Sequence, residues 1–186
     1  MNIKKLENKS LSTDDILKIM NHNVNIITYP SLKNYKSVEE IFKSSPNIIL
    51  YFEEEKKGSS VIGHWEALKK IGKTIQFFDG YGIAPDYCRK WLAENNLVVL
   101  KENTPELTRL LNKAIDDGYS VFWNHNKYQS YNKDVSTCGK WATSFLLNGN
   151  LQNNSYSDWI NSQIRKYSSK TYDEAICKWC FEKFGL

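Results

Sequence analysis

The middle of the sequence narrows the range of folds most, because three strand-like runs follow one another with only short turns between them. The runs are Asn47–Phe52, Val61–Leu68 and Thr74–Phe78, and the turns are Glu53–Ser60 and Lys69–Lys73. Parallel neighbours need a crossover of a dozen or more residues, so spacings this short favour antiparallel pairing. We therefore expect a central, mostly antiparallel sheet.

Segments with helical spacing lie on both sides of this region, which predicts an α+β fold with helices flanking the sheet. Helices are expected after Ser12-Thr13, at Ser37–Phe42, from Pro85 to about Glu94, from Pro105 (as first helical residue) to Gly118, and over Cys138–Asn148, Tyr156–Tyr167 and Thr171–Phe184. Val24–Tyr29 and Tyr119–Trp123 are further β-type runs, and Leu97–Leu100 is a brief apolar run. With 186 residues and no repeat or linker, residues 1–186 are expected to form a single domain.

Composition excludes several classes of protein. A hydrophobic fraction of 41% is ample for a core, so the chain is not disordered. The net charge of +4 comes from 22 lysines and only three arginines, beside 19 asparagines, a bias typical of AT-rich coding sequences. Few arginines weaken the case for sequence-specific nucleic-acid binding. No apolar run approaches a membrane span and the N-terminus does not look like a secretory signal, so we expect no membrane association.

The four cysteines are expected to be free thiols, as is usual inside cells. They are Cys88, Cys138, Cys177 and Cys180. Cys177-x-x-Cys180 is a single pair within an apparent helix, which favours buried structural thiols over a metal or redox site.

Three of the reactive side chains lie at the edges of regular elements. His64 lies in a strand, Asp79 ends the next strand, and Cys138 opens a helix. Thiols become good nucleophiles at a helix N-terminus beside an imidazole, and a carboxylate orients that imidazole. If the two strands pair antiparallel, Asp79 can reach His64. The pattern thus suggests a Cys-His-Asp set.

Acyl transfer also needs hydrogen-bond donors for the developing oxyanion. A backbone N–H at the helix start supplies one, and Gln129 on a polar loop upstream of Cys138 is the natural side-chain candidate. Asn124, His125 and Asn126 are alternatives for a donor or a base, whereas His22 is expected at the surface or at a helix end.

The order of these motifs resembles that of the adenain-like viral processing proteases and the related SUMO/ubiquitin-like-protein proteases. It runs from His64-Trp65 to Asp79 in a Phe-Asp-x-Tyr-Gly turn, then to Gln129 and Cys138-Gly139. Papain-like enzymes have the reverse order, Cys before His. The resemblance covers Val61 to Leu147 and implies the circularly permuted adenain/SUMO-protease form of the papain-like cysteine protease superfamily.

Carried over position by position, the resemblance implies that Cys138 is the nucleophile and His64 the general base and acid. It likewise implies that Asp79 is the orienting carboxylate and Gln129 the oxyanion donor. Trp65 packs by the catalytic groups or simply fills the core. Two features depart from the pattern: Gln129 and Cys138 are nine positions apart, slightly more than usual, and Thr137 stands where SUMO proteases carry Asp.

The function implied is a cysteine endopeptidase that cleaves viral capsid precursors, without cofactor or metal, in the host cytoplasm (viral factory) and the virion. A weak DNA or peptide activator is a further expectation. The alternatives are a deconjugating protease for ubiquitin-like modifiers, an acetyltransferase with the same His-acid-Cys order, and an inactive binding domain.

Overall fold

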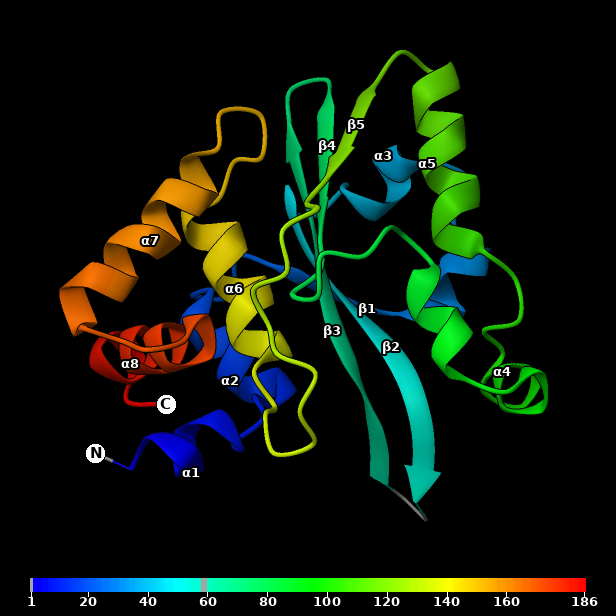
Figure 1. Cartoon of the computed structure of the whole chain (residues 1–186). Coiled ribbons are helices and arrows are strands. Elements are labelled where there is room, and N and C mark those ends of the chain that lie inside the picture. The colour runs from blue at the N-terminus through cyan, green and yellow to red at the C-terminus, as the bar shows by residue number, and fades with distance from the viewer. Residues whose placement is uncertain (1, 58–59) are drawn as a thin grey trace.

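A five-stranded sheet with helices on both faces forms the centre of the protein (Figure 1). The computed structural model describes residues 2–57 and 60–186, except for the side chains of residues 56–61. In spatial order, the strands are β1 (Asn25–Thr28), β2 (Asn47–Lys57), β3 (Ser60–Ile71), β4 (Thr74–Phe78) and β5 (Ser120–Trp123). The expected α+β class, with a central sheet flanked by helices, is confirmed.

The three central strands pair antiparallel, as their short turns predicted. Both edge strands instead pair parallel, β1 with β2 and β5 with β4. Each of these edge strands joins its neighbour through a long connection, which leaves room for a parallel arrangement. The sheet is therefore mixed at its edges.

Helices divide between the two faces of the sheet (Figure 1). One face carries α1 (Ile3–Glu7), α2 (Thr13–Ile19), α6 (Cys138–Asn148), α7 (Ser155–Tyr167) and α8 (Tyr172–Phe184), and the other carries α3 (Val38–Ile41), α4 (Glu94–Leu100), α5 (Glu106–Asp116) and the 3-10 turns Tyr29–Asn34 and Tyr87–Trp91. Both chain ends lie on the α6 side.

Strand β4 contributes side chains to the cores on both faces of the sheet, because successive strand residues point to opposite faces. Phe78 stacks on Phe145 of α6, with ring centroids 4.6 Å apart, and belongs to the same core as the fully buried Trp141. Phe77 belongs to the opposite core with Leu107 of α5. The two cores hold the helices against the sheet.

Several boundaries differ from expectation. The turn expected at Glu53–Ser60 is wrong, because β2 runs to Lys57 and β3 begins at Ser60. Backbone pairing with β3 extends β2 through the charged residues Glu53, Glu55, Lys56 and Lys57.

Other boundary errors concern helices. Helix α1 was not expected, and Leu97–Leu100 is the end of α4. The segment from Pro85 to Glu94 forms only a short 3-10 turn, Tyr87–Trp91. Pro105 precedes α5 rather than opening it, with ψ of 68° outside the helical range. Ser12 caps α2 in a reciprocal capping box with Asp15, at the start that the sequence predicted for this helix.

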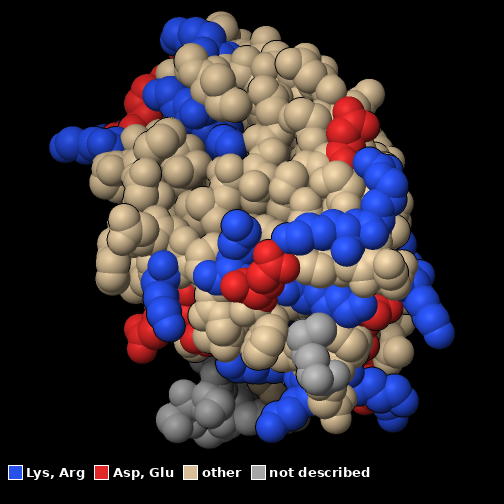
Figure 2. Space-filling view, turned by 90° about the vertical axis from the view of Figure 1, so that its left-hand side faces the viewer, with Lys and Arg blue, Asp and Glu red and all other residues tan. Residues whose placement is uncertain are grey.

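Basic side chains are spread over the face that includes α7 and α8 (Figure 2). Some are paired with acids, such as Lys166 with Glu182 and Lys178 with Glu174. Within the described part of the chain, no helix is both long and apolar enough to cross a bilayer.

Candidate active site

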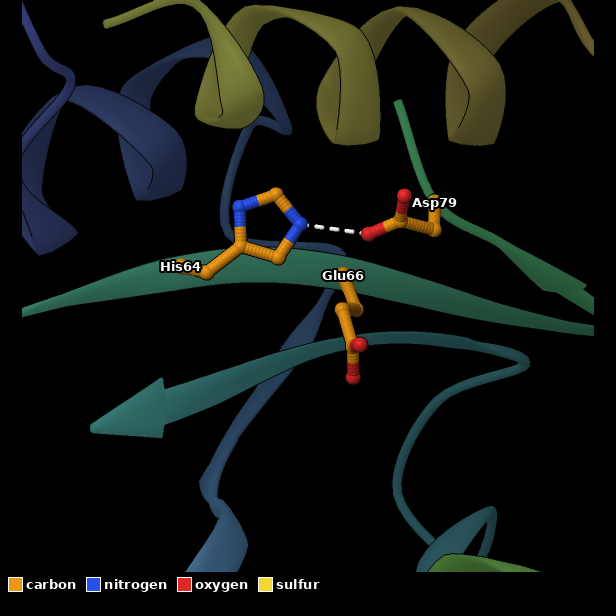
Figure 3. Close-up of side chains that lie close together, drawn as sticks. All are labelled: His64, Glu66 and Asp79. Carbon is orange, nitrogen blue, oxygen red and sulfur yellow. Dashed lines mark hydrogen bonds and ion pairs between the residues drawn. The ribbon is translucent and has the colours of Figure 1, made fainter. Parts of the chain in front are cut away.

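His64 and Asp79 meet where β3 runs past the end of β4. The two strands pair from Ile71 opposite Thr74 to Ala67 opposite Phe78, so Asp79 is the first residue beyond the ladder. Asp79 and His64 point toward one another, and the His64 Nε2 atom is hydrogen-bonded to the Asp79 Oδ2 atom (Figure 3). Both side chains are buried. The antiparallel pairing therefore brings together the two residues that the sequence suggested as partners.

Asn124, just beyond β5, holds the Asp79 peptide from two sides. The Asp79 N–H donates to the Asn124 Oδ1 atom (2.9 Å), and the Asn124 Nδ2 atom donates to the Asp79 carbonyl (2.8 Å). The Tyr81 N–H donates to the Asp79 Oδ1 atom (2.6 Å). With one carboxylate oxygen held by backbone, the other is aimed at His64. Asn124 thus orients Asp79, a role the sequence did not indicate.

The surroundings of His64 favour its charged form. Burial alone would lower the pKa of His64, but attraction by Asp79 and hydrogen bonds to Asp79 and Cys138 raise it well above its ordinary value. The ring stacks on Tyr81 with centroids 5.1 Å apart, and Trp91 contacts it edge-on. These aromatic rings limit water around the imidazole and hold it in place.

Cys138 is the first residue of α6 and lines the same cavity as His64. Its thiol contributes to the raised pKa of His64, and because Nε2 is taken by Asp79, Nδ1 is the ring atom left to face the thiol. The N-terminus of a helix carries unpaired N–H groups and the positive end of the helix dipole. A thiolate and an oxyanion would both be stabilised there.

Gln129 lies in the same cleft, packed over Gly80. The Gln129 N–H donates to the Gly80 carbonyl (2.8 Å), and its Nε2 atom donates to the Tyr81 hydroxyl (3.0 Å), which leaves one amide N–H over. A Cβ atom at position 80 would lie only 2.7 Å from the Gln129 Oε1 atom. Glycine at position 80 therefore permits the close approach of the glutamine.

A buried acid on α8 links the start of α6 to the loop that carries Gln129. The Asp173 Oδ1 atom accepts from the Thr137 hydroxyl (2.6 Å) and the Trp141 indole (3.0 Å), and its Oδ2 atom accepts from the Ser130 N–H (2.9 Å). Thr137, which stands where SUMO proteases carry Asp, thus has a buried partner for its hydroxyl. Asp173 was missed because nothing local marks an acid in a helical first turn as buried.

Glu66 is a second buried acid, close to the His64–Asp79 pair, and was not predicted from the sequence. Its ligand atoms lie within 4.8 Å of those of His64 and Asp79 (Figure 3). Burial, followed by the charge of Asp79, raises the pKa of Glu66 to about 8, and the Cys88 thiol lies beside it. Ligand-type atoms at this spacing can surround a metal ion, but His64 and Asp79 already bond one another. We therefore interpret the group as a hydrogen-bonded dyad with a neutral acid beside it.

His64, Gln129 and Cys138 line one cavity of about 600 Å³. Trp65 also lines it while packing in the α6-side core, so both interpretations of this residue apply. One wall is the segment before α2, where the Leu11 carbonyl accepts from the Trp65 indole (3.2 Å). The cleft is thus bounded by segments far apart in the sequence.

The remaining candidates lie away from this cleft. His125 and Asn126 are exposed and line other cavities, and His22 is an exposed residue at the end of α2. Cys88, Cys177 and Cys180 are buried free thiols, as expected.

The chain is similar to a viral protein in sequence and to proteases in structure. No protein-family model matches the chain. It is 28% identical over 175 residues to "Uncharacterized protein V9" of Sputnik virophage, covering 94% of this chain and 95% of that protein. Among solved structures it is similar to the ASFV pS273R protease (TM-score 0.48, 12% identity, 94% of this chain and 68% of that one). It is also similar to the SUMO protease Ulp1 (TM-score 0.41, 14% identity, 96% and 78%).

Proposed function

We propose that the protein is a cysteine endopeptidase that cleaves capsid precursor proteins during virion maturation. The observation that carries the proposal is the convergence of Cys138, the His64–Asp79 pair and Gln129 on one cleft. The motif order supports a protease, and the virophage relative supports a viral setting.

In the proposed mechanism, the Cys138 sulfur attacks the scissile carbonyl carbon as a thiolate. The raised pKa of His64 keeps the imidazole protonated beside that thiolate. The oxyanion forms next to the Gln129 amide and the backbone N–H at the start of α6, which stabilise its charge. His64 then protonates the leaving amine, so that a thioester and a free amine result.

Hydrolysis completes the cycle. With its proton given up, His64 accepts one from water as the water attacks the thioester carbonyl. Collapse of the second tetrahedral intermediate releases the carboxylic acid product and regenerates Cys138. Asp79 holds the imidazole in the orientation that both transfers need.

The decisive test is Cys138→Ala co-expressed with the capsid precursor of the virus that encodes this chain. We expect cleavage products in the wild type and uncleaved precursor in the variant, read by intact-mass measurement. Cys177→Ala is the matched control, because it removes a buried thiol on α8 that does not line the cleft. Cleavage by Cys138→Ala at the wild-type level would refute the proposal.

The host viral factory and the virion are the proposed places of action. A deconjugating protease would use the same chemistry, so ubiquitin-like probes with a C-terminal electrophile distinguish it by rapid labelling of Cys138. A DNA or peptide activator stays a prediction, and the net charge of +4 with partly paired lysines favours only a weak polyanion contact.

A further inference from the structure

A bulge in the β2–β3 ladder lies beside the candidate catalytic groups. Glu53 pairs with Gly63 and Glu55 pairs with Ile62, so Glu54 is an extra residue without a partner on β3. A Cβ atom at position 63 would lie 2.1 Å from the Phe52 carbonyl oxygen, so only glycine allows the strands this close approach. Bulges redirect a side chain out of the regular alternation. Here the redirected residue is an acid.

The Glu54 side chain lines the same cavity as His64 and Cys138. Among the residues that the structure describes, its carboxylate has no hydrogen bond or ion pair. Burial raises the pKa of Glu54, and the charge of His64 opposes that rise. A partly desolvated carboxylate without a dedicated partner gains free energy when a cation comes close.

The walls near Glu54 suit a long basic side chain. Ile62, which is 45% exposed, and the rings of Tyr51 and Trp65 line the cavity together with the Glu54 carboxylate. Lys and Arg lay their hydrocarbon stems along apolar surface and extend the charged group beyond it. The cleft therefore offers both a stem surface and an acceptor for the head group.

We propose that Glu54 selects a lysine or arginine side chain of the protein substrate within a few residues of the scissile bond. This inference rests on the proposed protease function and adds a specificity to it. The carboxylate binds substrate and takes no part in bond making or breaking.

The test begins with a library of decapeptides of random sequence, digested by the wild-type protein and read by mass spectrometry. We expect Lys and Arg enriched at one position near the cleaved bond. Two peptides are then made from one cleaved sequence, with Lys or Met at that position. The ratio of their kcat/KM values should be about tenfold in favour of Lys, which corresponds to about 1.4 kcal/mol, and should fall to about one in Glu54→Gln.

Glu55→Gln is the matched control, since Glu55 is the adjacent exposed acid and does not line the cleft. It should keep the full preference. No basic enrichment, or a preference that survives Glu54→Gln, would overturn the inference while leaving the protease proposal intact.

Binding of the Lys and Met peptides to Cys138→Ala gives a second readout without catalysis. If no library peptide is cleaved, the Lys and Met peptides are instead based on sequences of the capsid precursor. Their dissociation constants from Cys138→Ala are then the measurement that tests the inference. Tighter binding of the Lys form that depends on Glu54 supports the inference. Equal binding of both forms would overturn it.

Discussion

Asp79 and Glu66 both lie close to His64 and are equally buried, yet they differ in their hydrogen-bond partners. Asp79 accepts from a backbone N–H and bonds the His64 ring. Neither oxygen of Glu66 bonds a nitrogen or oxygen atom in the described residues, and burial raises the pKa of Glu66 to about 8. Equal burial therefore does not mean equal surroundings. Hydrogen-bond partners replace the water that Asp79 has lost, whereas Glu66 has no such donors and burial raises its pKa.

Asp79→Asn is the strongest test of this contrast. The amide keeps the shape of the carboxylate but removes the charge that holds the His64 imidazolium. We expect kcat/KM for peptide cleavage to fall by roughly 10²–10⁴-fold, with circular dichroism unchanged. If Glu66→Gln reduces activity as much as Asp79→Asn does, the two acids are not different in role.

Asn124→Ala should give the next largest effect. It leaves the buried Asp79 N–H without its partner, whereas the Asp79 carbonyl still accepts from the Gly82 N–H (3.0 Å). One unsatisfied buried group costs about 1–3 kcal/mol, so we expect the free energy of unfolding, measured by urea denaturation, to fall by that amount.

Asn126→Ala is the control for this measurement, because within the described part of the chain the exposed Asn126 side-chain amide bonds only the Tyr128 and Ser157 hydroxyls. Its loss should cost less than about 1 kcal/mol, in line with a partly exposed hydrogen bond. Equal losses in the two variants would show that Asn124 has no special role at Asp79.

Glu66→Gln should give the smallest effect on activity, and the sign of its effect on stability depends on pH. The folded-state pKa of about 8 lies above the ordinary value near 4.5, so between these values only the unfolded state is ionised. The wild type then loses stability as pH rises, by up to roughly 1.4 kcal/mol per pH unit. Gln removes this loss, so the stability of the variant relative to the wild type should increase from pH 5 to pH 8 in urea titrations. A difference independent of pH would show that Glu66 is already ionised in the folded state.

Much of the fold could be predicted where the signal is local. The apolar period of α6, the Ser12 cap of α2 and the short turn between β3 and β4 each depend on neighbours in sequence. The β2–β3 turn was misplaced because Glu, Lys and Ser resemble a loop, whereas cross-strand pairing extends both strands. The parallel edge pairs could not be predicted, since residues joined by a long connection carry no mark of their partner.

For the candidate site, the sequence determined the reactive side chains and their order, from His64 and Asp79 to Gln129 and Cys138. Their catalytic roles stay predictions. Only the tertiary structure decided what surrounds them: the Asn124 amide bonded to Asp79, the Asp173 carboxylate bonded to Thr137 at the start of α6, and the Glu54 bulge at the cleft. The physical reason is that the chemical type of a side chain depends on one sequence position alone. Its burial, hydrogen-bond partners and charge arise from residues tens of positions away, which only folding brings into contact.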